Sequence, residues 1–181
     1  ELAEKFHVSE ATVRRDLDDL DRQGALRRTH GGAIKADHST SFEHMYSEKI
    51  ALMPEAKQRI AARAAQMVHP GDTVLIDSGT TAFFIAQALS RHEGLTLITN
   101  DLYIAYQTPL HPSSTLIVTG GTRRQGRQEL IGTMPEDFIR STHVDVAFIG
   151  ADGISVTGGV TNANFEEIGV KKLMLRAAER S

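Results

Sequence analysis

The sequence predicts an α/β protein: a mostly parallel β-sheet with helices on both faces, preceded by a partial winged helix-turn-helix. After residue 57, four short β-branched runs alternate with helical segments, which is typical of a parallel sheet covered on both sides. Near the N-terminus, a capped amphipathic helix is followed by a basic stretch with two adjacent glycines. We expect a helix-turn-helix domain at residues 1–34, a linker at 35–56 and an α/β domain at 57–181.

The composition excludes several classes of protein. The 181 residues are 40% hydrophobic and 24% charged, as in an ordinary globular chain. The chain has no cysteine, which excludes a disulfide scaffold, a thiolate zinc site and a cysteine nucleophile. No apolar run is long enough to span a bilayer, and no apolar segment follows a basic start,. We therefore expect a cytoplasmic protein with no membrane partner.

Two short helices are expected before residue 24. Residues 2–6 form one or two helical turns, and Ser9 is a good N-cap for a helix over residues 10–23,. Gly24 is placed to end that helix. Its inward face is expected to consist of three residues that repeat at i, i+4 and i+7: Val13, Leu17 and Leu20,. Two helices joined by a three-residue turn predict a helix-turn-helix.

Local placement of cations indicates DNA binding, although the net charge of the chain is −3. An arginine pair lies in the first half of the second helix, the part that a recognition helix inserts into the major groove. Residues 25–34 predict a basic β-wing that turns at the two glycines. The candidate DNA-binding residues are Ser9, Thr12, Arg14, Arg15, Arg27, Arg28 and His30,. The alternative is a solvated helix face followed by a charged loop.

A family resemblance rests on these same residues. The stretch Val-Ser-Glu-Ala-Thr-Val-Arg-Arg-Asp-Leu at 8–17, followed by Leu-Arg-Arg-Thr-His-Gly-Gly at 26–32, closely resembles the winged helix-turn-helix of the DeoR family of bacterial sugar-catabolism repressors. The resemblance implies a bracing helix ahead of these two, which we expect to be missing before Glu1.

The linker is expected to be a partly ordered connector with some helix. Residues 36–41 are a polar cluster, and Pro54 interrupts the run before the next helix,. The side chains between them that can pack on a neighbour are Phe42, Met45, Tyr46, Ile50 and Leu52.

From residue 57, strands and helices alternate. The first helix is expected at 57–67, with Ile60, Ala61, Ala64 and Met67 facing inward. Strands are expected at 73–76, 95–98, 115–118 and 144–149,. Further helices are expected at 82–89, from 101 to 106, and from 165 to the end of the chain.

Small polar residues follow the four strands, at 78–81, 99–100, 119–121 and 150–153. Parallel strands bring such loops to one edge of a sheet, where ligands of open α/β sheets bind. The turn at 78–81 also directs backbone N–H groups and a helix dipole to one point, which favours an anion such as phosphate. Since neither a P-loop nor a dinucleotide fingerprint is present,, a small phosphorylated metabolite such as a sugar phosphate fits best.

Residues 57–181 resemble the DeoR-family sensor domain, which is related to ribose-5-phosphate isomerase. The matching segments include 76–81, 98–101, 118–121 and 148–154. The resemblance implies that a sugar phosphate binds the sensor and weakens operator binding, that the protein forms homo-oligomers, and that a further strand lies beyond Ser181. The candidate effector-binding residues are Asp77, Ser78, Gly79, Thr80, Thr81, Thr99, Asn100, Gly120, Gly121, Asp152, Gly153, Glu167 and Lys171.

Catalysis and metal binding are disfavoured. The eight histidines are scattered without metal-ligand spacing,, so we expect neither a metal site nor a cofactor. The enzymatic alternative is sugar-phosphate isomerisation, with Asp152 or Glu167 as the carboxylate base. A DNA-reading module makes a regulator the better interpretation, with operator DNA and a phosphorylated sugar as partners and no enzymatic activity.

Overall fold

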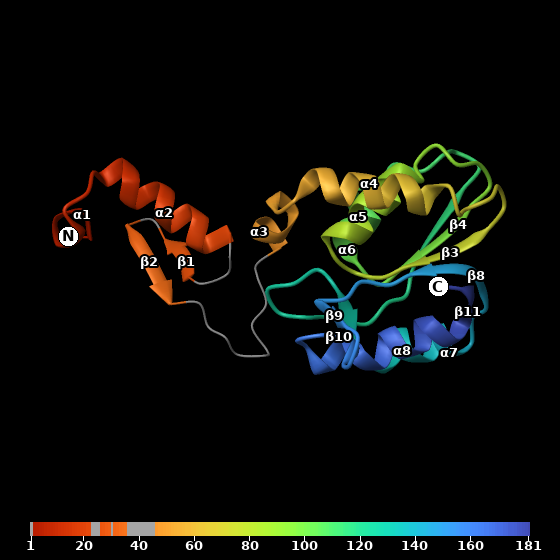
Figure 1. The fold of residues 1–181 in the computed structure, drawn as a ribbon. Helices are drawn as coiled ribbons and strands as arrows, with labels where there is room; N and C mark the ends of the chain where they lie inside the picture. Colours follow the sequence, from red (N-terminus) through yellow and green to blue (C-terminus); the bar gives the residue numbers. More distant parts are fainter. Residues whose placement is uncertain (1, 23–25, 30, 36–45) are drawn as a thin grey trace. The chain divides into compact units, whose positions relative to one another are not determined.

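The computed structural model describes residues 2–22, 26–29, 31–35 and 46–181. The chain divides into two compact units, Glu1–Phe42 and Glu43–Ser181, which are considered separately below (Figure 1).

The N-terminal unit contains the expected helix-turn-helix and wing. Its elements are α1 (Leu2–Phe6), α2 (Glu10–Arg22), β1 (Leu26–Thr29) and β2 (Gly32–Lys35). Ser9 caps α2, because its Oγ accepts a hydrogen bond from the Thr12 N–H at 3.1 Å,. Strands β1 and β2 are antiparallel, with Leu26 opposite Lys35 and Thr29 opposite Gly32.

The apolar face of α2 is only half covered. Val13 and Leu17 are half-buried, whereas Leu20 is 38% exposed, so the expectation that Leu20 faces a core is wrong. One helix of five residues and a two-stranded hairpin are the described neighbours of α2 in this unit, and they offer too little surface to cover the last turn of that face.

The larger unit is built around one sheet. Its first part contains α3 (Tyr46–Ala51), α4 (Pro54–Ala65), β3 (Thr73–Ile76), α5 (Thr80–Ala88), β4 (Thr96–Thr99), α6 (Leu102–Gln107) and β5 (Thr115–Val118). It continues with β6 (Thr122–Arg123), β7 (Leu130–Ile131), α7 (Thr133–Arg140), β8 (Val144–Phe148), β9 (Gly153–Ser155), β10 (Gly159–Thr161), η1 (Phe165–Glu167), α8 (Ile168–Ala177) and β11 (Ala178–Arg180). Within the described residues, no helix has the length and apolarity needed to cross a membrane.

Five parallel strands form the sheet in the order β11-β8-β3-β4-β5, which confirms the α/β fold class. Ile76 lies opposite Thr99 on one side and Phe148 on the other, and Thr99 lies opposite Val118. The strand ends therefore meet at one edge, as expected. The strand order reverses at β3, which has β4 on one side and β8 on the other. This reversal makes the β3/β8 junction the topological switch point.

Helices cover both faces of the sheet, and α4 and α5 lie opposite α7 and α8 (Figure 1). Alternate side chains of β3 point to opposite faces: Val74 and Ile76 belong to a core with α4, α5 and α6, whereas Leu75 belongs to a core with α7 and α8. Both cores are made of fully buried aliphatic side chains, so the sheet edge rests on a rigid base.

The C-terminal end of the chain differs from the expectation. The last helix stops at Ala177, and Ala178–Arg180 form β11, which pairs with β8. Arg180 holds this end in place, because its guanidinium donates to the Met67 carbonyl at 2.9 Å and pairs with Asp72 at 3.2 Å. The helix that was expected to run to the end of the chain is therefore too long, and the sheet gains a fifth strand.

Helix α4 also departs from the expectation, because it begins at Pro54 and ends at Ala65. Ala61 and Ala64 are buried as expected, but Ile60 is 50% and Met67 38% exposed. Both line a groove of about 620 Å³ between α4, the start of α5 and the end of β8. Their inward placement is therefore wrong, because no described segment covers this part of α4.

Candidate functional site

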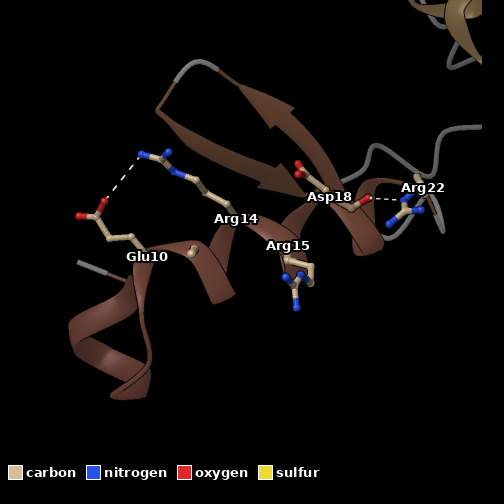
Figure 2. A pocket seen from close by; sticks show the side chains of 6 residues that line it. Glu10, Arg14, Arg15, Asp18 and Arg22 are labelled. Carbon is tan, nitrogen blue, oxygen red and sulfur yellow. Dashed lines mark hydrogen bonds and ion pairs between the residues drawn. The ribbon is translucent and has the colours of Figure 1, made fainter.

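The outer face of α2 presents cations in its N-terminal half. A shallow concavity of about 570 Å³ lies along this face and is lined by Glu10, Ala11, Arg14, Arg15, Asp18 and Arg22. Figure 2 shows the charged side chains among them. Arg14 lies 3.7 Å from Glu10, and both side chains are largely exposed, so this pair is weak. Arg15 is exposed and has no hydrogen-bond or ion-pair partner among the described residues. Its guanidinium is therefore available to a ligand.

Acidic residues in the second half of α2 bind Arg28 of the wing. Asp18 lies 3.0 Å from the Arg28 Nε, and Asp21 accepts from the Arg28 N–H at 3.3 Å. Arg28 also donates to the Gly32 carbonyl across the hairpin at 3.3 Å. Arg28 therefore joins α2, β1 and β2.

The remaining wing residues are only partly placed. Arg27 lies on β1 opposite Ile34, and His30 lies outside the described residues.

At the sheet edge, a buried ion pair joins three elements. Asp77, directly after β3, is bonded to the Lys171 ammonium from α8, and it accepts the Gly150 N–H at 2.9 Å. Lys171 also donates to the Gly150 carbonyl at 3.2 Å. The Asp77 side chain is 2% and the Lys171 side chain 11% exposed. Asp77 and Lys171 thus tie α8 to the loops after β3 and β8 at the switch point.

Charge and burial oppose each other at this pair. Burial raises the pKa of Asp77, and the Lys171 ammonium with the Gly150 N–H counters it. Burial disfavours the charged form of Lys171, but the carboxylates of Asp77 and Glu167 outweigh it and raise the pKa of Lys171,. Lys171 therefore carries a full positive charge at neutral pH.

Glu167 extends this network toward the β6–β7 hairpin. Its carboxylate lies 3.4 Å from Lys171 and 2.9 Å from the Arg124 Nη1. Arg124 also pairs with the buried Glu129 at 2.6 Å. Two asparagine amides donate to Glu167 as well. The Glu167 carboxylate is therefore occupied by contacts with side chains of the protein itself.

Asp152 follows β8 and faces the connector helix α3. Its Oδ1 lies 3.1 Å from the Lys49 Nζ, and its Oδ2 accepts the Ala163 N–H at 3.0 Å. Burial opposes ionisation of Asp152, but the Ala163 N–H and the Lys49 ammonium outweigh it and keep the pKa of this carboxyl below its usual value. A carboxylate with a lowered pKa is a poor general base at neutral pH.

The turn after β3 begins helix α5. Gly79 has a φ of +124°, which favours glycine, and its N–H donates to Asp101 at 3.2 Å. The expectation that the N–H groups of this turn are directed at an anion is therefore wrong for Gly79. Thr80 and Thr81 begin α5, so their N–H groups have no partner within the helix.

The remaining turn residues differ in accessibility. Thr80 is buried, whereas Ser78 and Thr81 are half-buried, and Thr81 lines the α4/α5 groove together with Gly150.

The loops after β4 and β5 have packing roles. Thr99 accepts the Asp101 N–H at 3.1 Å, and the Asn100 amide donates to the Leu130 carbonyl at 3.3 Å. A Cβ on Gly121 would lie 2.8 Å from Pro135, so close packing requires a glycine there. Strand β5 lies two strands from β3, about 10 Å away, and within the described part of the chain no hydrogen bond joins Gly120 or Gly121 to Asp77.

Five contact residues were absent from the candidate effector-binding residues: Lys49, Lys57, Asp101, Arg124 and Gly150. Of these, Gly150 belongs to the loop 150–153, which was expected at the sheet edge. Asp101 had a usable signal, because it follows a strand and caps α6 through the N–H groups of Tyr103 and Ile104,. Lys49 and Arg124 had none, since their partners lie 103 and 43 residues away.

Comparison with protein families assigns both units. The model of the DeoR-like helix-turn-helix domain matches residues 1–39, and that of the DeoR C-terminal sensor domain matches residues 53–181. The chain belongs to the DeoR family.

Curated relatives of this DeoR-family chain are named as transcriptional regulators. A putative aga operon transcriptional repressor from Escherichia coli O157:H7 is 34% identical over 99% of this chain and 67% of its own length. The glycerol-3-phosphate regulon repressor from Escherichia coli K12 is 34% identical over 97% and 69%. The regulator GolR from Listeria innocua is 31% identical over 99% and 70%. The family and these names are those of regulators, not enzymes.

Proposed function

We propose that this DeoR-family regulator represses a sugar-catabolism operon and leaves its operator when a phosphorylated sugar binds the sensor. The unpartnered Arg15 on the outer face of a capped α2 is the observation that supports DNA reading most directly. The names of two relatives, repressors of the aga operon and of the glycerol-3-phosphate regulon, support control of carbohydrate genes.

The proposed DNA contacts divide into two kinds. Arg15 and Arg14 read base edges, because they lie in the half of α2 that enters the major groove of a helix-turn-helix complex. Ser9 and Thr12 contact phosphate or bases beside them. Arg27 and His30 contact the DNA backbone, and Arg28 contributes by holding the wing on α2. Two modules of a homo-oligomer in the cytoplasm would match a palindromic operator.

The proposed effector site is the switch point between β3 and β8. The unpaired amides of Thr80 and Thr81 and the dipole of α5 favour the phosphate group, with Ser78 beside them. Lys171 supplies positive charge from α8, and the groove at Thr81 and Gly150 gives room for the sugar,. The residues after β5 lie too far along the edge to share a small ligand with Asp152.

Selection of bound sequences from a random duplex pool, using the full chain, tests the DNA half. We expect one recovered motif, with an affinity that falls steeply as salt rises because phosphate contacts release counterions. Recovery of unrelated duplexes with equal affinity would contradict sequence reading.

Thermal stabilisation by inorganic phosphate, glycerol 3-phosphate and a panel of aldose and ketose phosphates tests the sensor half. At least one sugar phosphate should raise the midpoint of the larger unit. Ser78→Asp should abolish that shift by repelling phosphate, whereas Thr157→Asp, on the exposed β9–β10 turn, should keep it. An unchanged shift in Ser78→Asp would place the ligand elsewhere.

A further inference from the structure

Few contacts hold the connector helix α3 on the sensor. It has six residues, none of them fully buried, and a helix of this length is unstable without tertiary contacts. The Tyr46 ring packs on Tyr103 with centroids 4.9 Å apart. The ion pair between Lys49 and Asp152, whose side chains are each 33% exposed, is a further contact that joins α3 to the loop after β8. The partner of Lys49 therefore contributes to the position of α3.

That partner lies on the loop of the proposed effector site. Asp152 comes two residues after Gly150, whose N–H binds Asp77 at the switch point. Asp152 is also fixed at its other oxygen by the Ala163 N–H, so the carboxylate stays in place if Lys49 leaves. A ligand that fills the β3/β8 edge thus arrives beside the Lys49–Asp152 pair.

The charge around Lys49 favours an anion. The Lys57 ammonium donates to the Lys49 backbone carbonyl, and it has no carboxylate partner among the described residues. Burial, followed by the charge of Lys49, lowers the pKa of Lys57, so the two lysines repel each other. Of these two ammonium groups, Lys49 has a carboxylate partner and Lys57 has none among the described residues, so a phosphate dianion would neutralise the excess positive charge.

We propose that Lys49 exchanges partners when the effector binds, leaving Asp152 for the effector phosphate, and that α3 thereby senses occupancy of the sensor. This inference rests on the proposed function. A partly exposed ion pair is weak, whereas a charge-assisted bond from an ammonium to phosphate is stronger, so the exchange is favourable. Because α3 follows residues 36–45 in sequence, release of its anchor acts on the segment next to the DNA-binding module.

If Asp152 and the effector phosphate compete for Lys49, removal of Asp152 and removal of Lys49 should change phosphate affinity in opposite directions. Calorimetric titration of the full chain with inorganic phosphate and with the aldose and ketose phosphates measures both. Asp152→Asn should bind the phosphates about two- to five-fold more tightly, because the competing carboxylate is gone. Lys49→Met should bind them roughly tenfold or more weakly. Lys172→Met, an exposed lysine on α8, should match the unaltered chain.

Hydrogen exchange over residues 46–52 measures the response of α3. A bound sugar phosphate should speed exchange about two- to five-fold in the unaltered chain. Lys49→Met should exchange fast without ligand and show no further change, while Lys172→Met responds normally.

The outcomes separate the two proposals. One contrary result is that sugar phosphates bind while Asp152→Asn weakens their binding as Lys49→Met does, and another is that they bind while hydrogen exchange in α3 does not respond to them. Either result would show that Lys49 does not change partners, and the proposed function would stand. If no phosphorylated compound binds the sensor, the proposed function fails and this inference fails with it.

Discussion

Lys171 and Asp77 form the most buried ion pair of the described residues, with side chains 11% and 2% exposed. Breaking a buried pair by removing one partner leaves an uncompensated charge and costs about 3–5 kcal/mol. Because the pair ties α8 to the loops after β3 and β8, it positions the sheet edge where we place the effector.

Lys171→Met should therefore destabilise the sensor in a pH-dependent way. Without the ammonium, burial raises the pKa of Asp77 further, so the folded protein must keep this carboxyl protonated. A raised folded pKa gives stability that is lost as pH rises from the unfolded value through the folded value. Urea unfolding should show a loss of about 3 kcal/mol or more at pH 8 and a smaller loss at pH 5.

Lys172→Met is the matched control, because this neighbouring lysine is exposed, and it should change the free energy of unfolding by less than about 0.5 kcal/mol. An equal loss at both pH values in Lys171→Met would show that Asp77 does not depend on Lys171 for its charge.

Arg15 is the residue that we propose reads base edges. Arg15→Ala should cost about 1–3 kcal/mol on the selected duplex and much less on random DNA, because a bidentate contact to a base is lost. Arg22→Ala, which removes a cation paired with Asp19 on the same helix, should leave the preference unchanged. Fluorescence anisotropy with both duplexes measures these affinities. Equal losses of affinity on both duplexes for Arg15→Ala would assign Arg15 to a contact with the DNA backbone.

Helix α2 and the wing behave as one element because acidic side chains join them. Asp18 and Asp21 both bind Arg28, so these anions hold the wing in place. In the proposed DNA complex their contribution is therefore structural, although their charge alone repels phosphate.

Asp18→Ala separates these two effects. Loss of an anion near DNA should raise affinity if only charge mattered, but we expect affinity to fall several-fold because the wing loses its brace. Asp16→Ala is the control, since Asp16 is exposed and has no partner among the described residues, and it should raise affinity slightly. Titration of the selected duplex at two salt concentrations compares them, and a gain in affinity for Asp18→Ala would refute the bracing role.

Elements with their own local signal were predictable from the sequence. Strands β3 and β5 lie at the expected residues, because β-branched runs between turns favour strand wherever they are placed. Strand β11 was missed, since Ala-Glu-Arg has no strand signature and pairing with β8 alone makes it extended. The hairpins β6–β7 and β9–β10 have two or three residues per strand, which is too few for an alternation of apolar and polar residues to be recognised in the sequence.

Across the larger unit, the sequence predicted which loops meet at the sheet edge better than it predicted the contacts between their side chains. The alignment of strand ends follows from a parallel sheet, so residues 77–81 and 150–153 were expected at one edge. The order of strands was not predictable, and it places the loop after β5 away from the switch point. Ion pairs such as Lys49–Asp152 join residues 103 positions apart, and only the folded chain reveals them.

The proposed coupling between the sensor and DNA must be reciprocal, which allows it to be measured from the ligand side. We would titrate a stabilising sugar phosphate into the full chain with and without saturating selected duplex. The account predicts that DNA weakens sugar-phosphate binding about 5- to 150-fold, the same factor by which the sugar phosphate weakens DNA binding. An identical sugar-phosphate affinity with and without the duplex would contradict it.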